Sequence, residues 1–242
     1  MKAFRDRGKT AIRVLLIADI HANSPALTAV LRDAGQVEMI LHAGDLVDYN
    51  PFPSDVISIA KESGIKSVMG NHDRDSAQNK PYGYNPIAEA SCHWTYHKLT
   101  IQERRYLLSL PEKSEVEISG LQVFLCHGSP TSLLDEYVYP ETNDQLFENF
   151  LEETSADLVI LGHTHIPFIK RIRNSKCVLN PGSVGQPRDH NPMASYMILE
   201  ILGKNEFHIS HRRVRYDIDK VYNSIVASGL PQILGERLYY GW

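Results

Sequence analysis

Short apolar runs alternate with amphipathic segments in the first part of the chain. The run IRVLLIA at 12–18 is nearly continuous and β-branched, as is typical of a strand buried on both faces. The next segment, 24–35, predicts a helix with Ser24 as its N-cap, Pro25 at its first position and Gly35 as its terminator. A buried strand followed directly by an amphipathic helix is a typical start of an α/β fold.

The same alternation of strand and helix patterns continues as far as residue 69. Apolar runs at 38–43 and 66–69 predict two further strands, and 53–64 predicts a second helix with similar start and stop signals. Strands separated by helices in this order are expected to lie parallel and to be joined by right-handed crossovers.

Hairpin patterns are more frequent in the second half of the chain. Residues 84–110 predict a helix with a bend near Leu99-Thr100, and 142–153 predict another helix. Strands or hairpins are predicted at 115–126, 157–162, 168–180 and 195–214. Together these patterns predict an α/β sandwich with a parallel half and a more antiparallel half.

The C-terminal tail, 217–242, has a weaker pattern than the rest of the chain. One short amphipathic segment at 219–227 is followed by LPQILGERLYYGW, for which the sequence predicts no place in the fold. Two alternatives are open for this end of the chain. It packs on the body of the domain, or it lies in a homodimer contact.

Length and composition narrow the class of protein. The 242 residues are 43% hydrophobic and 22% charged, which fits one globular domain over 1–242. The formal charge of -4 argues against duplex nucleic acid or an anionic membrane as a partner, because proteins that bind either one usually carry an excess of Lys and Arg. No apolar run approaches the roughly 18 residues needed to span a bilayer. Three isolated cysteines without C-x-x-C spacing indicate a reduced, cytoplasmic protein.

Polar side chains follow the predicted strands at the points where the strands end. These motifs are D-I-H at 19–21, G-D at 44–45, G-N-H-D at 70–73, H-G at 127–128, H-T-H at 163–165 and P-G-S at 181–183. Open α/β sheets bind ligands outside the carboxyl ends of their strands, because loops from several strands converge there. The motifs therefore predict a single site.

The residue types at these strand ends indicate a metal centre. Asp, Asn and His without thiolate suit borderline divalent ions such as Mn, Fe, Zn, Ni or Co. Seven residues are candidate ligands: Asp19, His21, Asp45, Asn71, His127, His163 and His165. These are too many for one four-coordinate ion, whereas two ions roughly 3.5–4 Å apart and sharing one carboxylate would use them all.

The order of these motifs resembles that of a known family. D-I-H, G-D-L-V-D, G-N-H-D, C-H-G and G-H-T-H, which run from 19 to 165, resemble the five signature blocks of the calcineurin-like metallophosphoesterase superfamily. NPGSVGQPRD at 180–189 resembles a further block of its compact bacterial and archaeal phosphodiesterase branch. The resemblance implies a four-layer α-β-β-α sandwich of two mixed sheets flanked by helices.

The resemblance also implies the roles of individual residues. A first divalent ion would be held by Asp19, His21 and His165, and a second by Asn71, His127 and His163, with Asp45 bridging both. A metal-bridging hydroxide would attack phosphorus, and His72 would act as general acid toward the leaving group. Asp48, three residues after Asp45, matches the carboxylate that orients this histidine in the phosphoprotein-phosphatase relatives.

Contacts with substrate are predicted for residues next to these blocks. Asn23 and Arg74 closely follow the first and third blocks, and each is a candidate to bind a phosphate oxygen. Ser183 and Arg188 are weaker candidates in the 180–189 loop, whose glycines allow a tight backbone path near the ions.

The segment at about 73–110 leaves the site directly after His72 and is the expected source of substrate specificity. Between residues 73 and 100 it contains the aromatic residues Tyr82, Tyr84, Trp94 and Tyr96. They either stack on a nucleobase or form the core of a helical hairpin. Structural roles are expected for His42, His93, His97 and Cys126, which lack the partners of a metal or catalytic motif.

The leading functional hypothesis is a metal-dependent phosphodiesterase that acts on small substrates, as the compact branch implies. A dinucleoside-polyphosphate (Ap4A-type) hydrolase is the main alternative. A phosphoprotein phosphatase ranks lower, because Tyr49-Asn50 follows Asp48 and Asp73 stands where that branch has Glu. A non-catalytic scaffold of the same fold is disfavoured, because His72 and all seven candidate ligands are present. The expected partner is therefore a small phosphoester or nucleotide.

Overall fold

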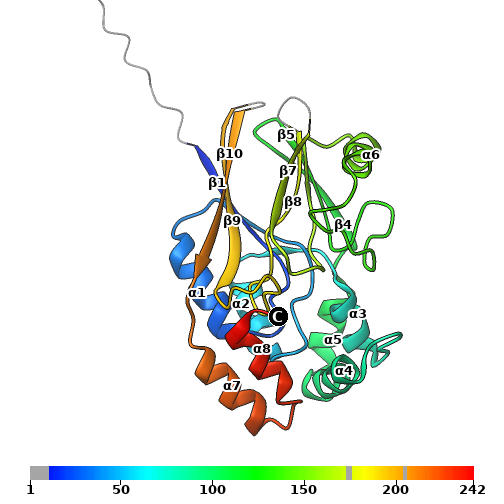
Figure 1. The fold of residues 1–242 in the computed structure, drawn as a ribbon, viewed down its shortest axis with the longest axis vertical. Helices are drawn as coiled ribbons and strands as arrows, with labels where there is room; N and C mark the ends of the chain where they lie inside the picture. Colours follow the sequence, from blue (N-terminus) through cyan, green and yellow to red (C-terminus); the bar gives the residue numbers. More distant parts are fainter. Residues whose placement is uncertain (1–10, 173–175, 204–205) are drawn as a thin grey trace, which may run out of the picture.

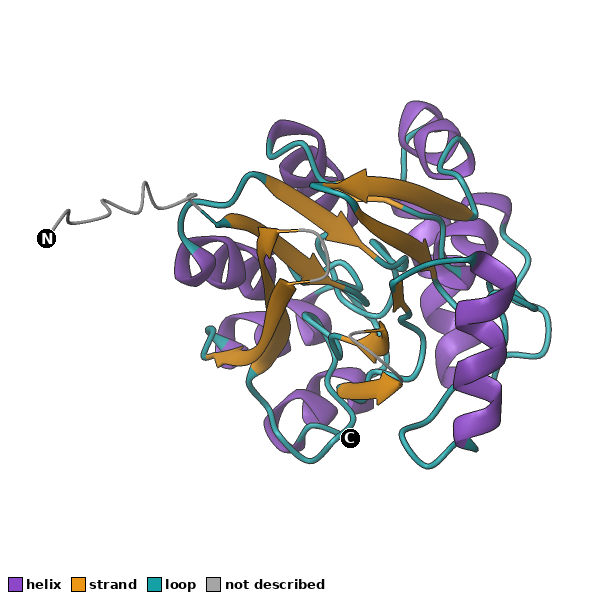
Figure 2. Ribbon diagram, turned by 90° about the horizontal axis from the view of Figure 1, so that it is seen from above, coloured by secondary structure: helices purple, strands orange, loops and turns teal. Residues whose placement is uncertain are grey.

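Two five-stranded sheets stack on each other, and helices cover their outer faces (Figures 1 and 2). The computed structural model describes residues 11–172, 176–203 and 206–242. In spatial order, the first sheet contains β10 (Glu206–Val214), β9 (Ala194–Gly203), β1 (Ile12–Ile17), β2 (Met39–His42) and β3 (Lys66–Ser67). The second sheet contains β4 (Lys113–Ile118), β5 (Leu121–Cys126), β6 (Leu158–Ile160), β8 (Lys176–Asn180) and β7 (Phe168–Ile172).

The helices divide between the two outer faces and one end of the sandwich. They are α1 (Ser24–Ala34), α2 (Pro53–Glu62), α3 (Asn71–Gln78), α4 (Pro86–Lys98), α5 (Ile101–Leu108), α6 (Asp144–Thr154), α7 (Ile218–Ala227) and α8 (Ile233–Tyr240). Helices α1 and α2 pack on the first sheet, and α6 packs on the second. Apolar side chains from both sheets meet between them, including Leu16, Leu125 and Leu158. The predicted four-layer α-β-β-α sandwich is confirmed.

Both sheets combine parallel and antiparallel pairs, with the antiparallel pairs on one side of the first sheet and at both edges of the second. Strands β1, β2 and β3 pair in parallel, and the hairpin of β9 and β10 extends that sheet in antiparallel. Strands β5, β6 and β8 are parallel, with β4 and β7 antiparallel at the edges. The predicted split into a parallel half and a more antiparallel half is therefore wrong, because each sheet is mixed.

Two local predictions are corrected by hydrogen bonds that the strand and helix patterns do not reveal. The N-cap of α1 is Asn23 and not Ser24, because the Asn23 Oδ1 atom accepts a hydrogen bond from the Ala26 amide at 3.1 Å. Helix α3 was not predicted, since Asn71-His72-Asp73 has the composition of a turn. It begins after Gly70, whose amide donates to Asp73 Oδ2 at 3.0 Å and thereby satisfies a free N–H at the helix start.

The segment after α3 and the C-terminal tail pack on each other. The predicted bend at Leu99-Thr100 separates α4 from α5, and Thr100 caps α5 together with Glu103. The tail forms α7 and α8, whose apolar side chains share a cluster with Tyr49 and with α4. The Trp94 indole also donates to the Ser228 carbonyl at 2.9 Å. Of the two alternatives for the tail, packing on the body of the domain is observed.

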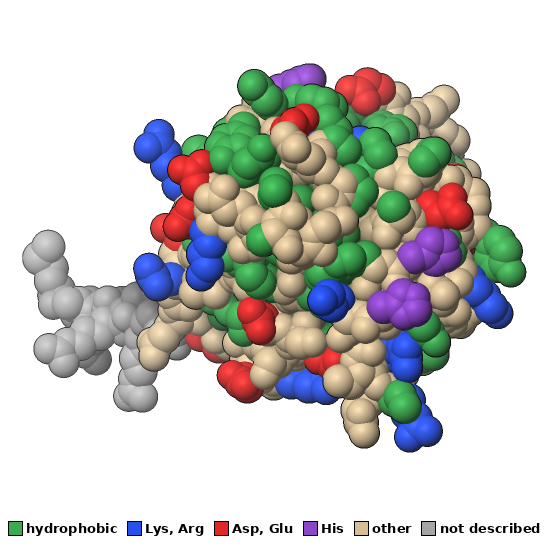
Figure 3. All heavy atoms as spheres, turned by 90° about the horizontal axis from the view of Figure 1, so that it is seen from below, with side chains coloured by type: hydrophobic (Ala, Val, Ile, Leu, Met, Phe, Trp, Pro, Cys, Tyr) green, Lys and Arg blue, Asp and Glu red, His purple; other side chains and the backbone are tan. Residues whose placement is uncertain are grey.

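Charged side chains of both signs are interspersed on the face shown in Figure 3. This distribution matches the nearly balanced count of 25 Lys+Arg against 29 Asp+Glu. Within the described ranges, no helix has the length and hydropathy that a bilayer span requires.

Candidate metal centre

The loops that leave β1, β2, β5 and β6, together with the start of α3, bring the seven predicted ligands to one place. Asp19, His21 and His165 form one group, and Asp45, His127 and His163 form another. Within each group the potential ligand atoms all lie within 4.8 Å of one another. All seven side chains are buried, Asn71 included, so the groups are held by the protein and not by solvent.

The backbone at these residues is held in an uncommon conformation. Five of the candidate ligands have positive φ, at 53° for Asp19, 45° for His21, 63° for Asp45, 70° for His163 and 61° for His165. Such left-handed conformations cost a non-glycine residue on the order of 1–3 kcal/mol, and they cluster at functional sites. Hydrogen bonds between neighbouring loops hold them, such as Asp19 N to Gly44 O at 3.0 Å and His21 N to Asp45 O at 3.0 Å.

Two glycines are required by the close approach of ligand side chains. A Cβ atom on Gly70 would stand 2.0 Å from Asp45 Oδ1, and one on Gly44 would stand 2.6 Å from His127 Nδ1. Gly44 also has a φ of 87°, which disfavours any side chain there. The glycines of the G-D and G-N motifs therefore make room for the ligands that they precede or face.

In the first group, the Nε2 atoms of His21 and His165 face each other, and neither of them carries a hydrogen. His21 Nδ1 lies 3.1 Å from Val47 O, and His165 Nδ1 lies 2.6 Å from Gln186 O. A carbonyl only accepts, so each Nδ1 carries the hydrogen, and burial lowers the pKa of both rings, which keeps them neutral. The two Nε2 lone pairs then point at each other across 3.0 Å, an arrangement that a cation stabilises.

The second group also contains imidazole and carboxylate side chains, but here the carboxylate raises the pKa of one imidazole. His127 Nδ1 donates to Ala43 O at 2.7 Å, while its Nε2 faces Asn71 Oδ1 at 3.0 Å, His163 Nδ1 at 3.1 Å and Asp45 Oδ2 at 3.1 Å. Burial lowers the pKa of His127, but the Asp45 carboxylate outweighs burial and raises that pKa to about 9. The negative charge of the group therefore attracts a positive charge to this position, either a proton or a metal ion.

Two buried carboxylate oxygens without a hydrogen-bond donor also favour cations at these positions. Asp19 Oδ2 and Asp45 Oδ2 are buried and have no hydrogen-bond partner among the described residues. Asp45 Oδ2 lies 3.6 Å from His21 Nε2 and 3.1 Å from His127 Nε2, so this carboxylate faces both groups. Oxygen and imidazole ligands around two positions, with one carboxylate between them, are a donor set for two borderline divalent ions.

His72 lies beside this centre and is fixed by Asp48. His72 Nδ1 is 2.7 Å from Asp48 Oδ2, and the His72 amide donates to Asp45 Oδ1 at 2.9 Å. Asp48 Oδ1 accepts from the Tyr49 amide at 2.7 Å and from the Ser91 hydroxyl, so the carboxylate cannot turn freely. Burial lowers the pKa of His72, but the charges of Asp45 and Asp48 outweigh burial and raise it. The structure thus places the two predicted catalytic residues in contact.

Three residues that the sequence had not assigned to the site also belong to it. Tyr49 Oη lies 3.2 Å from His72 Nε2, and the Tyr49 ring centre is 4.6 Å from that of His21. Tyr84 Oη accepts from Asn71 Nδ2 at 2.8 Å, which leaves the Asn71 oxygen directed at the centre.

The third of these residues is Asp73, whose carboxylate accepts from the backbone amides of Asp45 at 2.9 Å and Leu46 at 2.8 Å. It therefore fixes the G-D-L loop that carries Asp45. The only signal for it in the sequence was its place in the G-N-H-D block, where it was compared with Glu and given no role.

The predicted substrate contacts are not brought to the centre in the same way. Asn23 is buried, and its Nδ2 donates to Gly185 O at 3.0 Å while its Oδ1 caps α1. The Arg74 guanidinium pairs with Asp75 at 2.7 Å and with Asp135 at 3.2 Å. These contacts engage both side chains with protein groups, and their binding to a phosphate oxygen stays a prediction.

The 180–189 loop closes the centre from another side. The Ser183 hydroxyl donates to Asp19 O at 2.7 Å, and a Cβ on Gly185 would stand 1.8 Å from Ile20 O, so the tight path expected of this loop is confirmed. The Arg188 amide donates to His165 O at 3.4 Å. Ser183 therefore supports the D-I-H loop from behind, whereas Arg188 extends from the rim of the site.

The other predicted structural residues lie outside the two ligand groups. His42 Nδ1 contacts Ser67 Oγ at 2.6 Å, and His93 Nδ1 contacts Asn79 Oδ1 at 2.6 Å. His97 is exposed next to Tyr96, and Cys126 is fully buried in β5. Of the aromatic residues in the 73–110 segment, Tyr84 and Trp94 join the cluster that includes α7 and α8, so the core alternative describes these two.

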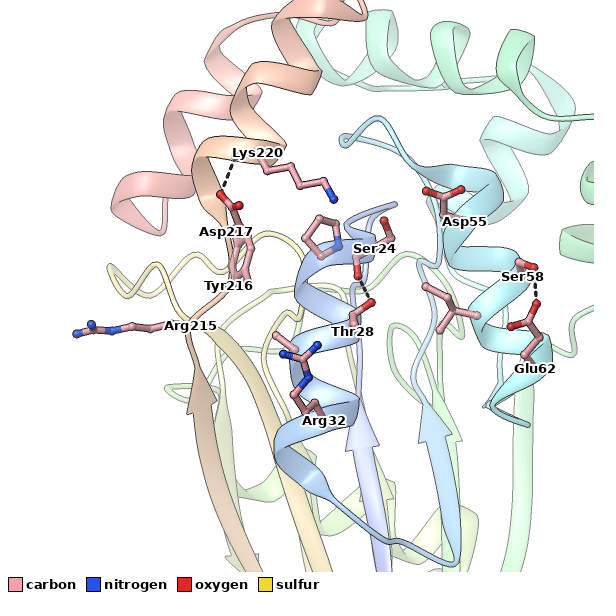
Figure 4. A pocket seen from close by; sticks show the side chains of 13 residues that line it. Ser24, Thr28, Arg32, Asp55, Ser58, Glu62, Arg215, Tyr216, Asp217 and Lys220 are labelled. Atoms are coloured by element: carbon pink, nitrogen blue, oxygen red, sulfur yellow. Dashed lines mark hydrogen bonds between the residues drawn. The ribbon is translucent and has the colours of Figure 1, made fainter.

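A cavity of about 710 Å³ lies away from this centre, between α1, α2 and the start of α7 (Figure 4). Charged residues of both signs line it, among them Arg32, Asp55 and Lys220. None of the candidate ligands is part of its wall. Its size therefore does not make it the site of the chemistry described above.

Comparison with known proteins gives concordant matches. Residues 12–204 match the family model of the calcineurin-like phosphoesterase superfamily domain. The chain is 35% identical to the uncharacterized protein MJ0912 of Methanocaldococcus jannaschii, over 94% of this chain and 98% of that protein. It is 30% identical to a probable metallophosphoesterase of Methanothermobacter thermautotrophicus, over 78% of this chain and 86% of that one.

A solved structure resembles the whole chain. The crystal structure of a metallophosphoesterase from Sphaerobacter thermophilus superposes with a TM-score of 0.81 at 33% sequence identity. The superposition covers 96% of this chain and 100% of that one.

Proposed function

The chain belongs to the calcineurin-like phosphoesterase superfamily, and on that basis we propose that it is a dinuclear metal-dependent phosphoesterase that hydrolyses small phosphodiesters. The observation that carries the proposal is the position of Asp45, which faces both groups of candidate ligands, at 3.6 Å from His21 and 3.1 Å from His127. A shared carboxylate between two clusters is the arrangement that a two-metal phosphoesterase needs.

The ligand assignment follows the two clusters. Asp19, His21 and His165 would hold one divalent ion, and Asn71, His127 and His163 the other, with Asp45 shared between them. When bound, two such ions supply Lewis acidity, which both acidifies water and neutralises charge on phosphate oxygens. The ions fit Mn, Fe, Zn, Ni or Co, since the ligands are imidazole nitrogen and oxygen without thiolate.

His72 is proposed to protonate the leaving oxygen of the ester. Asp48 holds the Nδ1 hydrogen of His72, so the transferable proton is carried at Nε2. The raised pKa of His72 favours the form of the ring that carries this proton. The Tyr49 hydroxyl lies 3.2 Å from Nε2, at the position where a leaving oxygen would accept the proton. Before substrate binds, this contact fixes the His72 ring. General acid help of this kind contributes about 10²–10⁴-fold to the rate.

The alternatives differ in how the structure bears on them. A non-catalytic scaffold has no need for His72 and Asp48 to contact each other beside seven converging ligands. A phosphoprotein phosphatase still lacks its typical residues, because Tyr49 and Asn50 follow Asp48 and pack into the site. We further propose that the partner is a small phosphoester or nucleotide and that the protein acts in the cytoplasm, where its three free, buried cysteines would stay reduced.

A substrate panel tests this function. The purified protein would be loaded with manganese and assayed on bis(p-nitrophenyl) phosphate, cyclic nucleotides, dinucleoside polyphosphates and phosphopeptides. We expect the highest kcat/KM on a phosphodiester or a dinucleoside polyphosphate, and loss of that activity after chelation. Negligible rates on every ester of the panel, with two metals bound, would falsify the enzymatic proposal.

A further inference from the structure

The C-terminal helix α8 forms part of the wall around Tyr49. Leu234 and Leu238 of α8 belong to the same apolar cluster as Tyr49. The end of the tail is fixed to the 188–191 segment, because Gly241 O accepts a hydrogen bond from the His190 amide at 2.7 Å. The contact is tight, since a Cβ on Gly241 would stand 2.6 Å from backbone atoms of Asn191. Arg237, one residue before Leu238, is thereby held in the region between Tyr49 and this segment.

Arg188 approaches the same tyrosine from the other side of the site. Its guanidinium carbon lies 5.8 Å from the centre of the Tyr49 ring, and its Nη2 donates to Gln186 Oε1 at 3.1 Å. Burial is the main cause that lowers the pKa of His21 and His165, and the positive charge of Arg188 lowers the pKa of both further. Arg188 therefore faces the centre from its rim.

Among the described residues, the two guanidinium groups lack the carboxylate partners that Arg74 and Arg213 have. Arg74 pairs with Asp75 and Arg213 pairs with Asp189, but within the described residues no ion pair neutralises Arg188 or Arg237. Arg237 Nε is also buried without a hydrogen-bond partner there.

Backbone hydrogen bonds also bring Arg237 toward the segment that carries Arg188, because Arg237 O accepts from the Gly241 amide at 2.9 Å and Gly241 O accepts from the His190 amide at 2.7 Å. Burial lowers the pKa of Arg237, and the nearby charge of Arg188 lowers it further. Holding two unneutralised cations together costs free energy, which a bound anion would offset.

We propose that Arg188 and Arg237 bind a second phosphoryl group of the substrate, so that the bond that is cleaved is a phosphoric anhydride whose leaving group is itself a phosphate, as in a nucleoside polyphosphate. A guanidinium presents a fork of donors that matches two phosphate oxygens. The Tyr49 side chain contacts both His72 and Arg188, so a phosphoryl group bound by Arg188 would lie on the side of the leaving oxygen. The proposal rests on the proposed function and specifies the substrate of that site.

The reaction of such a substrate balances with one water molecule. The oxygen of water bonds to the attacked phosphorus, and the bond from that phosphorus to the bridging oxygen breaks. The leaving phosphate keeps the electron pair of the broken bond and takes the proton of His72, and the two guanidinium groups neutralise the remaining charge that develops on it. One proton of the water returns to His72, and the other is released to solvent.

The first experiment measures binding without turnover. Isothermal titration calorimetry would compare inorganic pyrophosphate with inorganic phosphate on the wild type, on Arg237→Gln and on Arg237→Lys. The wild type should bind pyrophosphate more tightly than phosphate, and Arg237→Gln should lose about ten- to a hundredfold in affinity for pyrophosphate, as expected for a charge-assisted hydrogen bond. Arg237→Lys should recover part of that loss. Arg105→Gln, on an exposed position of α5, is the matched control and should bind pyrophosphate like the wild type.

The second experiment separates this proposal from the proposed function. The manganese-loaded proteins would be assayed on a dinucleoside tetraphosphate and on bis(p-nitrophenyl) phosphate, which has no second phosphoryl group. Arg237→Gln should lower the ratio of kcat/KM for the tetraphosphate over the diester about tenfold or more, with an unchanged melting temperature. Equal pyrophosphate affinity in the wild type and Arg237→Gln, or an unchanged ratio, overturns the role of Arg237. Hydrolysis of the diester in those same samples shows that the proposed function stands, and no hydrolysis of either substrate by the wild type overturns the proposed function instead.

Discussion

The Nδ1 atom of His72 lies 2.7 Å from Oδ2 of Asp48, and this contact joins the start of α3 to the loop after β2. It fixes the tautomer of the imidazole and directs Nε2 away from Asp48, toward Tyr49. The carboxylate is itself held by the Tyr49 amide, so the ring has a defined orientation before any substrate binds. The predictions below start from this pair.

Replacing Asp48 should change the pH dependence of turnover. The carboxylates of Asp45 and Asp48 raise the pKa of His72, so the acid form persists to higher pH, and kcat should fall as the pH rises through that raised pKa. Asp48→Asn removes one of the two charges, so the falling limb of the kcat profile should move to lower pH. A pH–rate profile measures this shift, with Asp144→Asn on the exposed start of α6 as the control. A limb at the wild-type position would contradict the pairing.

Replacing His72 should separate catalysis from metal binding. His72→Ala removes the proposed proton donor but none of the candidate ligands, so both metals should stay bound while kcat falls by about 10²–10⁴-fold. The matched control is His97→Ala, which removes an exposed histidine outside the site. Metal content by mass spectrometry and turnover of a phosphodiester measure the two effects. Normal turnover in His72→Ala would remove the proposed acid.

Replacing Tyr84 should weaken one metal position. Tyr84→Phe removes only the hydroxyl that accepts a hydrogen bond from Asn71 Nδ2 at 2.8 Å, so the Asn71 amide loses its fixed orientation. Loss of such a supporting contact typically costs 10–100-fold in metal affinity. A manganese titration should therefore show one weakened site and one unchanged site. Tyr82→Phe, at a side chain that is 80% exposed, serves as the control, and two unchanged affinities in Tyr84→Phe would contradict the role given to that hydroxyl.

Metal binding should release protons. The pKa of His127 is raised to about 9, so its ring is protonated at pH 7 and must lose that proton to bind a cation. Metal affinity should therefore increase as the pH rises toward 9, and calorimetry in buffers of different ionisation enthalpy should detect about one or more protons released per chain at pH 7. Binding without proton release, or an affinity that falls as the pH rises, would show that His127 is not a ligand.

Removing Asp45 should affect both metal positions at once. The carboxylate faces both ligand groups, so Asp45→Ala should abolish tight binding of both ions and reduce turnover to background. Asp144→Ala is the control for loss of a carboxylate elsewhere. Metal content after gel filtration measures the result. Two metals retained per Asp45→Ala chain would contradict a shared ligand.

The sequence predicted the strands and the convergence of the candidate ligands because both depend on local patterns. A buried strand is a short apolar run, and the residue after it lies at the sheet edge wherever the strand is placed. Asp19 and His163 follow different strands of different sheets, yet the His163 amide donates to Asp19 Oδ1 at 3.2 Å. This contact joins the two stacked sheets, and the sandwich of two sheets was implied by the resemblance to the family and not by the local patterns.

The supporting residues could not be predicted, because their roles depend on contacts between distant segments. Asp73 looks like part of a turn until its carboxylate is seen to accept from the amides of Asp45 and Leu46. Arg74 follows the G-N-H-D block as a phosphate ligand would, but Asp135 lies 61 residues away in the chain and pairs with it. Asn23 caps α1 and holds Gly185, a residue 162 positions away. The packing of Leu234 and Leu238 in the cluster that contains Tyr49 depends likewise on how the tail folds back.

Anomalous diffraction from crystals grown with manganese and phosphate tests the central claim most directly. The account predicts two manganese peaks per chain, roughly 3.5–4 Å apart, with the Asp45 carboxylate between them and an anion contacting both. Asp19, His21 and His165 should surround one peak, and Asn71, His127 and His163 the other. A single peak, or two peaks that do not share Asp45, would contradict the account.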